Sequence, residues 1–261
     1  MIIDLHAHLG HYPFARTVCH DAAGLLALMD RHGIDQAVVS SLHSVFYRHA
    51  HAGNEEVIRA VGAHPGRLIP LATVDPTYAG WEFDLDLAVN RWKVRGLYLV
   101  PGYHPYRLND ANGRLALKRA VDCGLPVVIP QRFEDRRRRH WMDTTEDVKF
   151  EEVAEVARSF PDLKVLLLNW ARLDARKIRS AGLAGRILID LARLPVRLDP
   201  EVPALIDGLG ITAVGFGTDL PISAPGPAFV KLAMLSSLAP ADLERIKWRN
   251  AAEFLKIPGT R

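Results

Sequence analysis

Cysteine is scarce in this chain, and long apolar runs are absent. The 261 residues include two cysteines, Cys19 and Cys123, which lie far apart and form no CxxC pair. This spacing predicts free thiols in a reducing compartment rather than a disulfide framework. Nowhere do 18 apolar residues follow one another, so we expect no membrane-spanning helix. The first residues carry no basic segment before an apolar core, so we expect no signal peptide and a cytoplasmic location.

An excess of one charge sign is also lacking. The chain has 33 lysines and arginines against 30 aspartates and glutamates, which gives a formal net charge of +3. A nucleic-acid partner would require a wider basic face with interleaved aromatic residues, and the sequence shows neither. The composition, with 49% hydrophobic and 24% charged residues, is typical of a globular protein of enzyme size. We expect a small-molecule substrate, no nucleic acid and no membrane, and a homo-oligomer is compatible with the sequence.

Short apolar runs rich in valine, isoleucine and leucine recur along the chain. There are eight of them: 2–5, 36–40, 67–74, 94–100, 125–129, 163–168, 186–190 and 211–217. Their polarity does not alternate, which is typical of strands buried on both faces of a parallel sheet. Eight strands separated by amphipathic stretches predict an α/β fold, a single (β/α)₈ TIM barrel that spans residues 1–261. An open, doubly wound sheet is the alternative.

Capping residues mark the ends of several amphipathic stretches. The predicted helices begin at or after Asn54, Asp110, Thr145 and Pro240, and two of them end at Gly124 and Pro161. Asparagine, aspartate and threonine side chains can accept hydrogen bonds from the free N–H groups of a first helical turn. Proline suits the first helical position, and glycine suits the residue after the last turn. We therefore predict helices between the strands of the barrel.

Two histidines, His6 and His8, lie one residue apart at the end of the first apolar run. Residues i and i+2 of a strand point to the same face, so both imidazoles should converge. Converging imidazoles are typical metal ligands. In a (β/α)₈ barrel the chemistry lies at the carboxyl ends of the strands, where Asp219 follows the eighth run. The sequence therefore predicts a metal site formed by His6, His8 and Asp219.

Three motifs carry a resemblance to a known family: IDLHAHLG at 3–10, GTDLP at 217–221 and RNAAEFLKI at 249–257. They resemble the amidohydrolase-related metal-dependent hydrolases, and more narrowly the branch with aminocarboxymuconate-semialdehyde decarboxylase and several lactonases. The resemblance implies a (β/α)₈ barrel with zinc or a similar ion on the two histidines. It also implies that the aspartate of the eighth strand, here Asp219, is a metal ligand and a proton shuttle.

The chain departs from this family at two strand ends. Members usually end the fifth strand in a ligand histidine, where this chain has Pro130 or Gln131, and many end the sixth in a histidine, where it has Asn169. No histidine follows His140, so no later imidazole can replace them. The remaining ligands suit a single divalent ion, with Zn²⁺ the expected one. Loss of the metal is the alternative, and a dinuclear centre is not expected.

Other residues at the predicted barrel mouth are candidates for catalysis or substrate binding. His104 and His140 could act as acid–base imidazoles beside Asp219. Arg132 begins a run of five arginines and could bind a carboxylate through its forked guanidinium. Three further substrate-binding candidates are Gln131, Tyr103 and Asn169. Exposed loop positions are the alternative for the histidines and most of the arginines.

These residues predict an amidohydrolase-type enzyme. A metal-activated water would attack an ester, lactone or amide bond of a small, carboxylate-bearing substrate, and Asp219 would take the proton. Non-oxidative decarboxylation of an aromatic or dienoic acid is an alternative on the same scaffold. A barrel that has lost the metal and binds a ligand without catalysis is another, and a metal-free hydrolase is a third.

Overall fold

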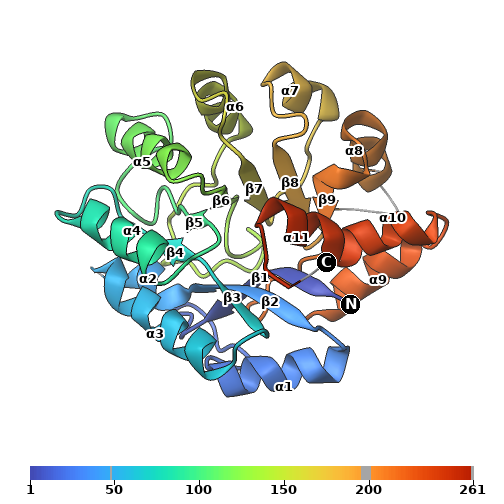
Figure 1. Ribbon diagram of the computed structural model, residues 1–261, viewed down its shortest axis with the longest axis horizontal. Coiled ribbons are helices and arrows are strands. Elements are labelled where there is room, and N and C mark those ends of the chain that lie inside the picture. Colours follow the sequence, from blue (N-terminus) through green and yellow to red (C-terminus); the bar gives the residue numbers. More distant parts are fainter. Residues whose placement is uncertain (48, 195–200, 260–261) are drawn as a thin grey trace.

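Parallel strands form a ring at the centre of the molecule, and helices surround it (Figure 1). The computed structural model describes residues 1–47, 49–194 and 201–259. The strands are β1 Ile3–Leu9, β2 Gln36–Ser41, β3 Leu68–Pro70, β4 Ala72–Thr73, β5 Leu97–Tyr98, β6 Val127–Pro130, β7 Val165–Leu168, β8 Ile187–Asp190 and β9 Val214–Gly215. Each of the eight predicted apolar runs overlaps a strand, and the run 67–74 contains both β3 and β4. The predicted (β/α)₈ barrel is confirmed.

The strands pair in chain order, and backbone hydrogen bonds join the two sheets at both ends. One sheet has the order β1-β2-β3 and the other the order β4-β5-β6-β7-β8-β9. Leu71 lies between β3 and β4 and donates its N–H to Val39 in β2. At the other junction, Leu5 in β1 donates to the carbonyl of Phe216 just after β9, at 2.9 Å. The first and last strands are therefore neighbours.

Helices follow most of the strands along the chain and surround the ring (Figure 1). They are α1 Ala22–His32, α2 Leu42–Phe46, α3 Ala50–Ala63, α4 Trp81–Asn90, α5 Ala111–Asp122, α6 Phe150–Ser159, α7 Ala175–Ser180, α8 Glu201–Leu209, α9 Gly226–Met234, α10 Pro240–Glu244 and α11 Asn250–Phe254. A 3₁₀ turn spans Ile211–Ala213, and a π-helical turn spans Arg245–Arg249. Among the described residues, none of these helices is both long and apolar enough to cross a membrane.

Several predicted helix ends are confirmed. Asp110 caps α5 by accepting a hydrogen bond from the backbone N–H of Gly113 at 2.8 Å. Gly124 follows the end of α5 with a φ of +64°, a conformation that glycine adopts without a side-chain clash. Pro240 is the first residue of α10, and α6 ends at Ser159, shortly before Pro161.

Two predicted helix starts are wrong. Thr145 lies in the loop before α6, which begins at Phe150. Asn54 lies inside α3, where its buried side chain is hydrogen-bonded to Thr73 of β4. An asparagine side chain can satisfy backbone groups of a strand as well as those of a helix end. Asn54 therefore serves a neighbouring strand rather than its own helix.

Alternate residues of the strands pack into two separate layers. In β6, Val127 and Ile129 pack in the layer between strands and helices, whereas Val128 packs in the barrel interior. In β7, Val165 and Leu166 divide in the same way. Because both faces of each strand are buried, apolar residues occupy consecutive positions, which explains the continuous apolar runs in the sequence.

The two cysteines form no disulfide, as predicted. Cys19 is buried and Cys123 is half-buried, and both are free. Burial raises the pKa of the Cys19 thiol to about 11, so the thiol stays protonated at neutral pH. Neither cysteine contributes a covalent constraint to the fold.

We expect Asn54→Ala to destabilise the fold. The Asn54 Nδ2 donates to Thr73 O at 2.7 Å, and its Oδ1 accepts from Thr73 N at 2.9 Å. Alanine would leave two buried backbone groups unpaired, so the free energy of unfolding should fall by about 2–4 kcal/mol in urea denaturation. The exposed Asn112→Ala on α5 is the control and should change it by no more than about 0.5 kcal/mol. Equal effects would contradict this role for Asn54.

Candidate metal centre

Two imidazoles and one carboxylate converge at the carboxyl end of β1. His6 and His8 lie on β1, and Asp219 lies in the segment after β9. The two histidine Nε2 atoms are 3.1 Å apart, and Asp219 Oδ1 is 3.5 Å from that of His6 and 3.8 Å from that of His8. All three side chains are buried. Within the part of the chain that the structure describes, no other group of histidine, cysteine or acidic residues converges in this way.

The backbone holds Asp219 in place. Its N–H donates to the carbonyl of His6 at 2.9 Å, and its φ of +66° lies in the left-handed region. The preceding Thr218 is fixed by Asp4 of β1, which accepts hydrogen bonds from both the backbone N–H and the hydroxyl of Thr218. Aspartate tolerates the left-handed region better than most residues. This conformation turns the Asp219 carboxylate toward the two histidines.

Each imidazole is also held at its other nitrogen. His6 Nδ1 is 2.9 Å from Asp190 Oδ2, at the end of β8, and His8 Nδ1 is 2.8 Å from Ser40 Oγ in β2. The Asp190 carboxylate accepts from Nδ1 of His6, so Nε2 of His6 faces the centre. With Ser40 Oγ accepting from Nδ1 of His8, the Nε2 lone pair of His8 faces the centre as well. Such outer partners orient imidazoles for metal binding.

Burial and charge set the ionisation of the three groups. Burial would lower the pKa of His6, but the carboxylates of Asp219 and Asp190 outweigh it and raise the pKa. Burial lowers the pKa of His8 to about 4. Burial would raise the pKa of Asp219, but His6, His8 and Arg193 together outweigh burial and lower the pKa. At neutral pH Asp219 is therefore ionised and His8 is neutral, as metal ligands must be.

The donor set fits a divalent metal ion. Two imidazole nitrogens that face one another at 3.1 Å repel unless a proton or a cation lies between them. Two nitrogen ligands of a tetrahedral zinc ion would lie about 3.3 Å apart. Among the described residues, Asp219 Oδ1 has no hydrogen-bond partner although it is buried, so it is free to accept from a cation. His6, His8 and Asp219 are therefore the residues that could hold an ion.

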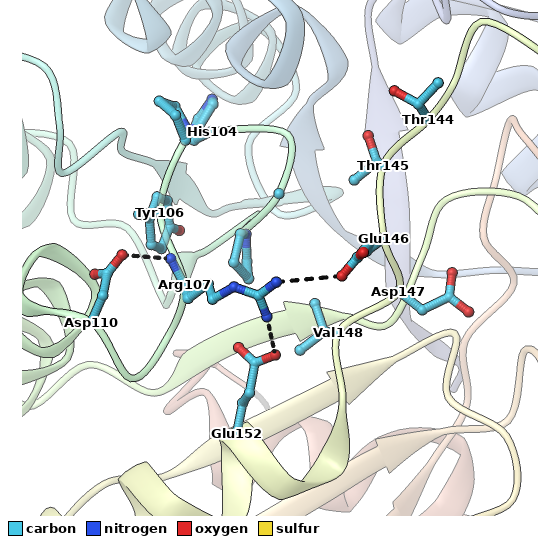
Figure 2. A pocket seen from close by; sticks show the side chains of 13 residues that line it. His104, Tyr106, Arg107, Asp110, Thr144, Thr145, Glu146, Asp147, Val148 and Glu152 are labelled. Atoms are coloured by element: carbon cyan, nitrogen blue, oxygen red, sulfur yellow. Dashed lines mark hydrogen bonds and ion pairs between the residues drawn. The ribbon is translucent and has the colours of Figure 1, made fainter.

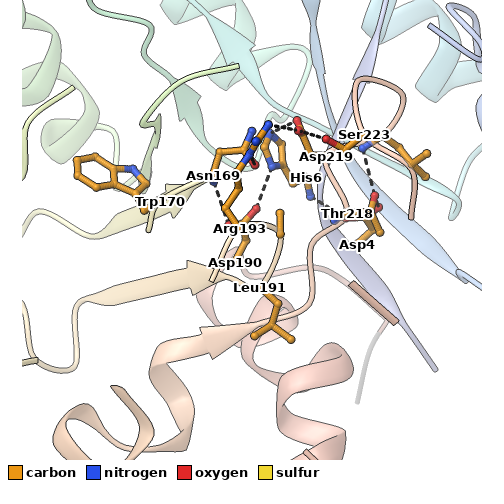
Figure 3. A network of polar contacts seen from close by, with 12 residues as sticks. Asp4, His6, Asn169, Trp170, Asp190, Leu191, Arg193, Thr218, Asp219 and Ser223 are labelled. Carbon is orange, nitrogen blue, oxygen red and sulfur yellow. Dashed lines mark hydrogen bonds and ion pairs between the residues drawn. The ribbon is translucent and has the colours of Figure 1, made fainter. Parts of the chain in front are cut away.

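An arginine that the sequence interpretation missed reaches this centre (Figure 3). Arg193 follows β8, and its Nη2 is 3.4 Å from Asp219 Oδ2. Its Nε donates to Asn169 Oδ1 at 3.3 Å, and the Asn169 N–H donates to Asp190 Oδ1 at 3.0 Å. Asn169, a predicted substrate-binding residue, therefore anchors a guanidinium beside the centre. The only signal for Arg193 in the sequence is its position just after a strand end, which many arginines share.

Aromatic rings close the space beside His8. Phe133, in the segment after β6, is fully buried, and its ring centroid lies 5.6 Å from that of His8. Further rings surround Phe133 at centroid distances of 5.1 Å for Tyr103, 6.2 Å for Phe46, 6.4 Å for Tyr12 and 6.5 Å for Tyr98. The segment after β6 thus folds inward, and it shields the three converging side chains from water.

Three residues at the end of β6 do not point at the centre. Pro130 is the last residue of β6 and offers no ligand atom. The Arg132 Nη2 lies 2.6 Å from Gln131 Oε1 and 3.1 Å from Asp147 Oδ2. Arg132 and Gln131 line a cavity of about 810 Å³, and none of the three converging residues belongs to its described lining. The backbone carbonyl of Arg132, rather than its guanidinium, contacts a residue beside the centre: it accepts from Asn169 Nδ2 at 3.2 Å.

Tyr103 and His140 lie at the rim of the aromatic enclosure. The Tyr103 hydroxyl donates to Asp143 Oδ2 at 2.7 Å, and its ring meets the edge of Phe133. The His140 ring stacks on Phe14 with the centroids 5.9 Å apart, and its Nδ1 accepts from the backbone of Met142. The structure thus brings Tyr103 to the ring nearest the centre and leaves His140 farther out.

His104 lines a different cavity, of about 530 Å³ (Figure 2). This cavity lies between the segment after β5 and the residues around Glu146, and Arg107 bridges it by contacting Glu146 and Glu152. His104 Nε2 donates to the carbonyl of Ser44 at 3.1 Å, and burial lowers the pKa of His104. The described lining includes neither of the β1 histidines. His104 is therefore placed to support the fold near the mouth rather than to contact the centre.

The family assignment follows from a match over almost the whole chain. The model of a family described as Amidohydrolase matches residues 3–257. This chain belongs to the amidohydrolase family. The predicted resemblance and the prediction of an enzyme of this superfamily are both confirmed. No curated protein sequence matches the chain.

Solved structures with the same fold include several decarboxylases. The 5-carboxyvanillate decarboxylase of Sphingomonas paucimobilis has a TM-score of 0.76 at 15% identity, over 98% of both chains. The 2,6-dihydroxybenzoate decarboxylase of Rhizobium has a TM-score of 0.70 at 17% identity, over 99% of both chains. The 5-carboxyvanillate decarboxylase of Novosphingobium aromaticivorans, complexed with manganese and 4-hydroxy-3-methoxy-5-nitrobenzoic acid, has a TM-score of 0.74 at 12% identity, over 98% of this chain and 96% of that one. At these identities the likeness shows the barrel fold alone.

We expect Asp190→Asn to weaken metal binding without unfolding the barrel. The amide would remove the charge that orients His6 through Nδ1, and loss of such an outer partner lowers metal affinity by about 10- to 100-fold. Affinity is measured by competition with a chromophoric chelator, and circular dichroism checks the fold. The exposed Asp207→Asn on α8 is the matched control and should bind metal like the wild type. Unchanged affinity in Asp190→Asn would contradict the role of Asp190.

Proposed function

We propose that this protein is a metal-dependent decarboxylase of an aromatic carboxylic acid. The observation that carries the proposal is the position of the two imidazoles and Asp219 beside a cluster of buried aromatic rings. Aromatic walls favour a planar ring through stacked and edge-to-face contacts. The structurally similar enzymes named above act on aromatic acids, and one of them was solved with a nitrobenzoic acid and manganese.

His6, His8 and Asp219 would hold one divalent ion in this enzyme. Imidazole ligands suit zinc, and the manganese of the similar structure suits the same residues, so both ions are candidates. When bound, the ion supplies positive charge that orients the anionic groups of a substrate and stabilises negative charge during the reaction. The rings of Tyr12, Tyr98 and their neighbours exclude water, which strengthens these electrostatic interactions.

Decarboxylation also needs a proton carrier at the centre. The bond between the ring carbon and the carboxylate breaks, its electron pair stays on the ring carbon, and a proton must reach that carbon as carbon dioxide leaves. Asp219, which is ionised at rest, is the proposed carrier: it would take up a proton from water at Oδ2 and pass it to the ring carbon. Ser223 Oγ lies 2.8 Å from this oxygen and Arg193 Nη2 lies 3.4 Å from it, so both groups position the carboxylate.

Hydrolysis of an ester, lactone or amide through a metal-activated water is the second candidate. It would use the same three ligands and is the activity that the sequence motifs favour most directly. The aromatic enclosure and the similar decarboxylases support decarboxylation better. A barrel that binds an aromatic acid without metal or catalysis is the remaining alternative, and the experiment below separates all three.

We expect the full chain, purified without a chelator, to contain about one divalent ion and to release carbon dioxide from an aromatic acid. The test acids are 5-carboxyvanillate and 2,6-dihydroxybenzoate, with elemental analysis for the metal and carbon dioxide capture for the reaction. His6→Ala/His8→Ala should lose the ion and at least about a thousandfold of the rate. The control His20→Ala/His49→Ala removes two exposed imidazoles and should keep both.

Two outcomes would overturn the proposal. Hydrolysis of a lactone panel with no carbon dioxide from either acid would favour the hydrolase. No metal after loading with excess zinc or manganese, together with no turnover, would favour a ligand-binding barrel.

A further inference from the structure

Arg193 has two groups of partners. Asn169 and Asp219 follow strand ends and form the floor of the barrel mouth, and Phe133 and Asp135 belong to the loop after β6. On the floor, its Nε donates to Asn169 Oδ1 at 3.3 Å, and its Nη2 lies 3.4 Å from Asp219 Oδ2 (Figure 3). On the loop side, Nη2 donates to the carbonyl of Phe133 at 3.1 Å, and Nη1 lies 3.8 Å from Asp135 Oδ2. The side chain is only 20% exposed.

Of the two loop partners, the Phe133 carbonyl lies within hydrogen-bond distance of Arg193, and the Asp135 carboxylate does not. Asp135 is 3.8 Å away, which is beyond hydrogen-bond distance, and its carboxylate is shared with Arg137 at 2.9 Å. The Nη1 of Arg193 therefore has no full hydrogen bond among the described residues, although a guanidinium can donate from all its nitrogens. A guanidinium nitrogen without a full hydrogen bond is one that an anionic group can satisfy.

The same loop segment fills the space beside the centre. The Phe133 side chain is fully buried among the rings of Tyr103, Phe46 and Tyr12, next to His8. The benzene ring of Phe133 thus already occupies the aromatic enclosure beside His8. A substrate ring of the same size could enter only if Phe133 left, and the Phe133 carbonyl would then leave Arg193.

We propose that Arg193 binds the carboxylate of the substrate and that the segment 131–149 is a lid. In the closed lid, the Phe133 ring occupies the position of the substrate ring until the acid displaces it. When the lid lifts, Nη1 and Nη2 lose their loop partners while Asn169 and Asp219 still hold the guanidinium. A forked guanidinium then presents two parallel donors, the geometry that a carboxylate accepts. This inference rests on the proposed function for the identity of the substrate as an aromatic acid.

Arg193 suits this role better than Arg132, the arginine that the sequence favoured. Arg132 is engaged by Asp147 and Gln131 and lines the outer cavity of about 810 Å³. Arg193 contacts Asp219, one of the three converging residues, directly. An anion bound by Arg193 would therefore lie within reach of the same centre.

The test compares an acid with the same ring lacking the carboxylate. The probes are 2,6-dihydroxybenzoate and resorcinol, titrated calorimetrically into the full chain in its metal-loaded and metal-depleted forms. Arg193→Gln should weaken binding of the acid by about 10- to 100-fold in both forms and leave resorcinol within about twofold. Arg193→Lys should recover part of the affinity. Arg176→Gln on α7 is the charge-matched control, because it removes an arginine that is 85% exposed. It should leave the affinity for both probes unchanged.

The outcomes separate this inference from the proposed function. Equal weakening of acid and resorcinol in Arg193→Gln, or no weakening of the acid, would overturn the assignment of Arg193. A wild-type chain that fails to bind the acid in either form would overturn it as well. Acid binding that depends on Arg193 without release of carbon dioxide would support this inference and contradict the proposed decarboxylase.

Phe133→Ala tests the lid. If the Phe133 ring competes with the substrate ring, its removal should strengthen binding of both probes several-fold, because the closed state no longer excludes them. Phe83→Ala, which removes a phenylalanine that is 72% exposed on α4, is the control and should change neither affinity. Weaker binding of both probes in Phe133→Ala would show instead that the ring is part of the wall, and would contradict the displacement.

Discussion

Two imidazole nitrogens that face each other at 3.1 Å inside a barrel need positive charge between them, and the surrounding residues are arranged to meet this need. Asp219 supplies a carboxylate on one side, and Asp190 holds the far nitrogen of His6. Arg193 offsets the charge of Asp219, so the centre buries its carboxylates next to cations or donors. Buried charges persist in a fold only when they are paired in this manner. The polar residues at this end of the barrel follow from that single requirement.

The order of the strands could be predicted from the sequence, because parallel strands buried on both faces leave continuous apolar runs, and eight such runs recur between amphipathic stretches. Some helix ends could not be predicted in this way. Asn54 looks like a helix cap from its type and position, yet its amide is hydrogen-bonded to Thr73 in β4, 19 residues along the chain. Partners of this kind depend on packing between elements, which local sequence does not encode.

The same contrast holds at the site. His6 and His8 could be placed on one face because strand geometry alone decides it, and Asp219 follows from the rule that strand ends share one mouth. Arg132 and Arg193 could not be told apart in this way. Both follow strand ends, and only the path of each loop decides that Arg132 turns to Asp147 while Arg193 turns to Asp219. Loop conformation depends on contacts made in the folded barrel, so it is the feature hardest to predict from the sequence.

The three converging residues come from opposite ends of the chain, and this has a consequence for how the protein is made. On the ribosome, His6 and His8 emerge first and Asp219 emerges last, so the full set of ligands cannot assemble until β9 lies beside β1. Contacts between such distant positions form late, since closing a long loop costs more conformational entropy than closing a short one. An ion bound by His6, His8 and Asp219 would stabilise the contact between the first and last strands. It would therefore slow the unfolding of the closed barrel in the cell.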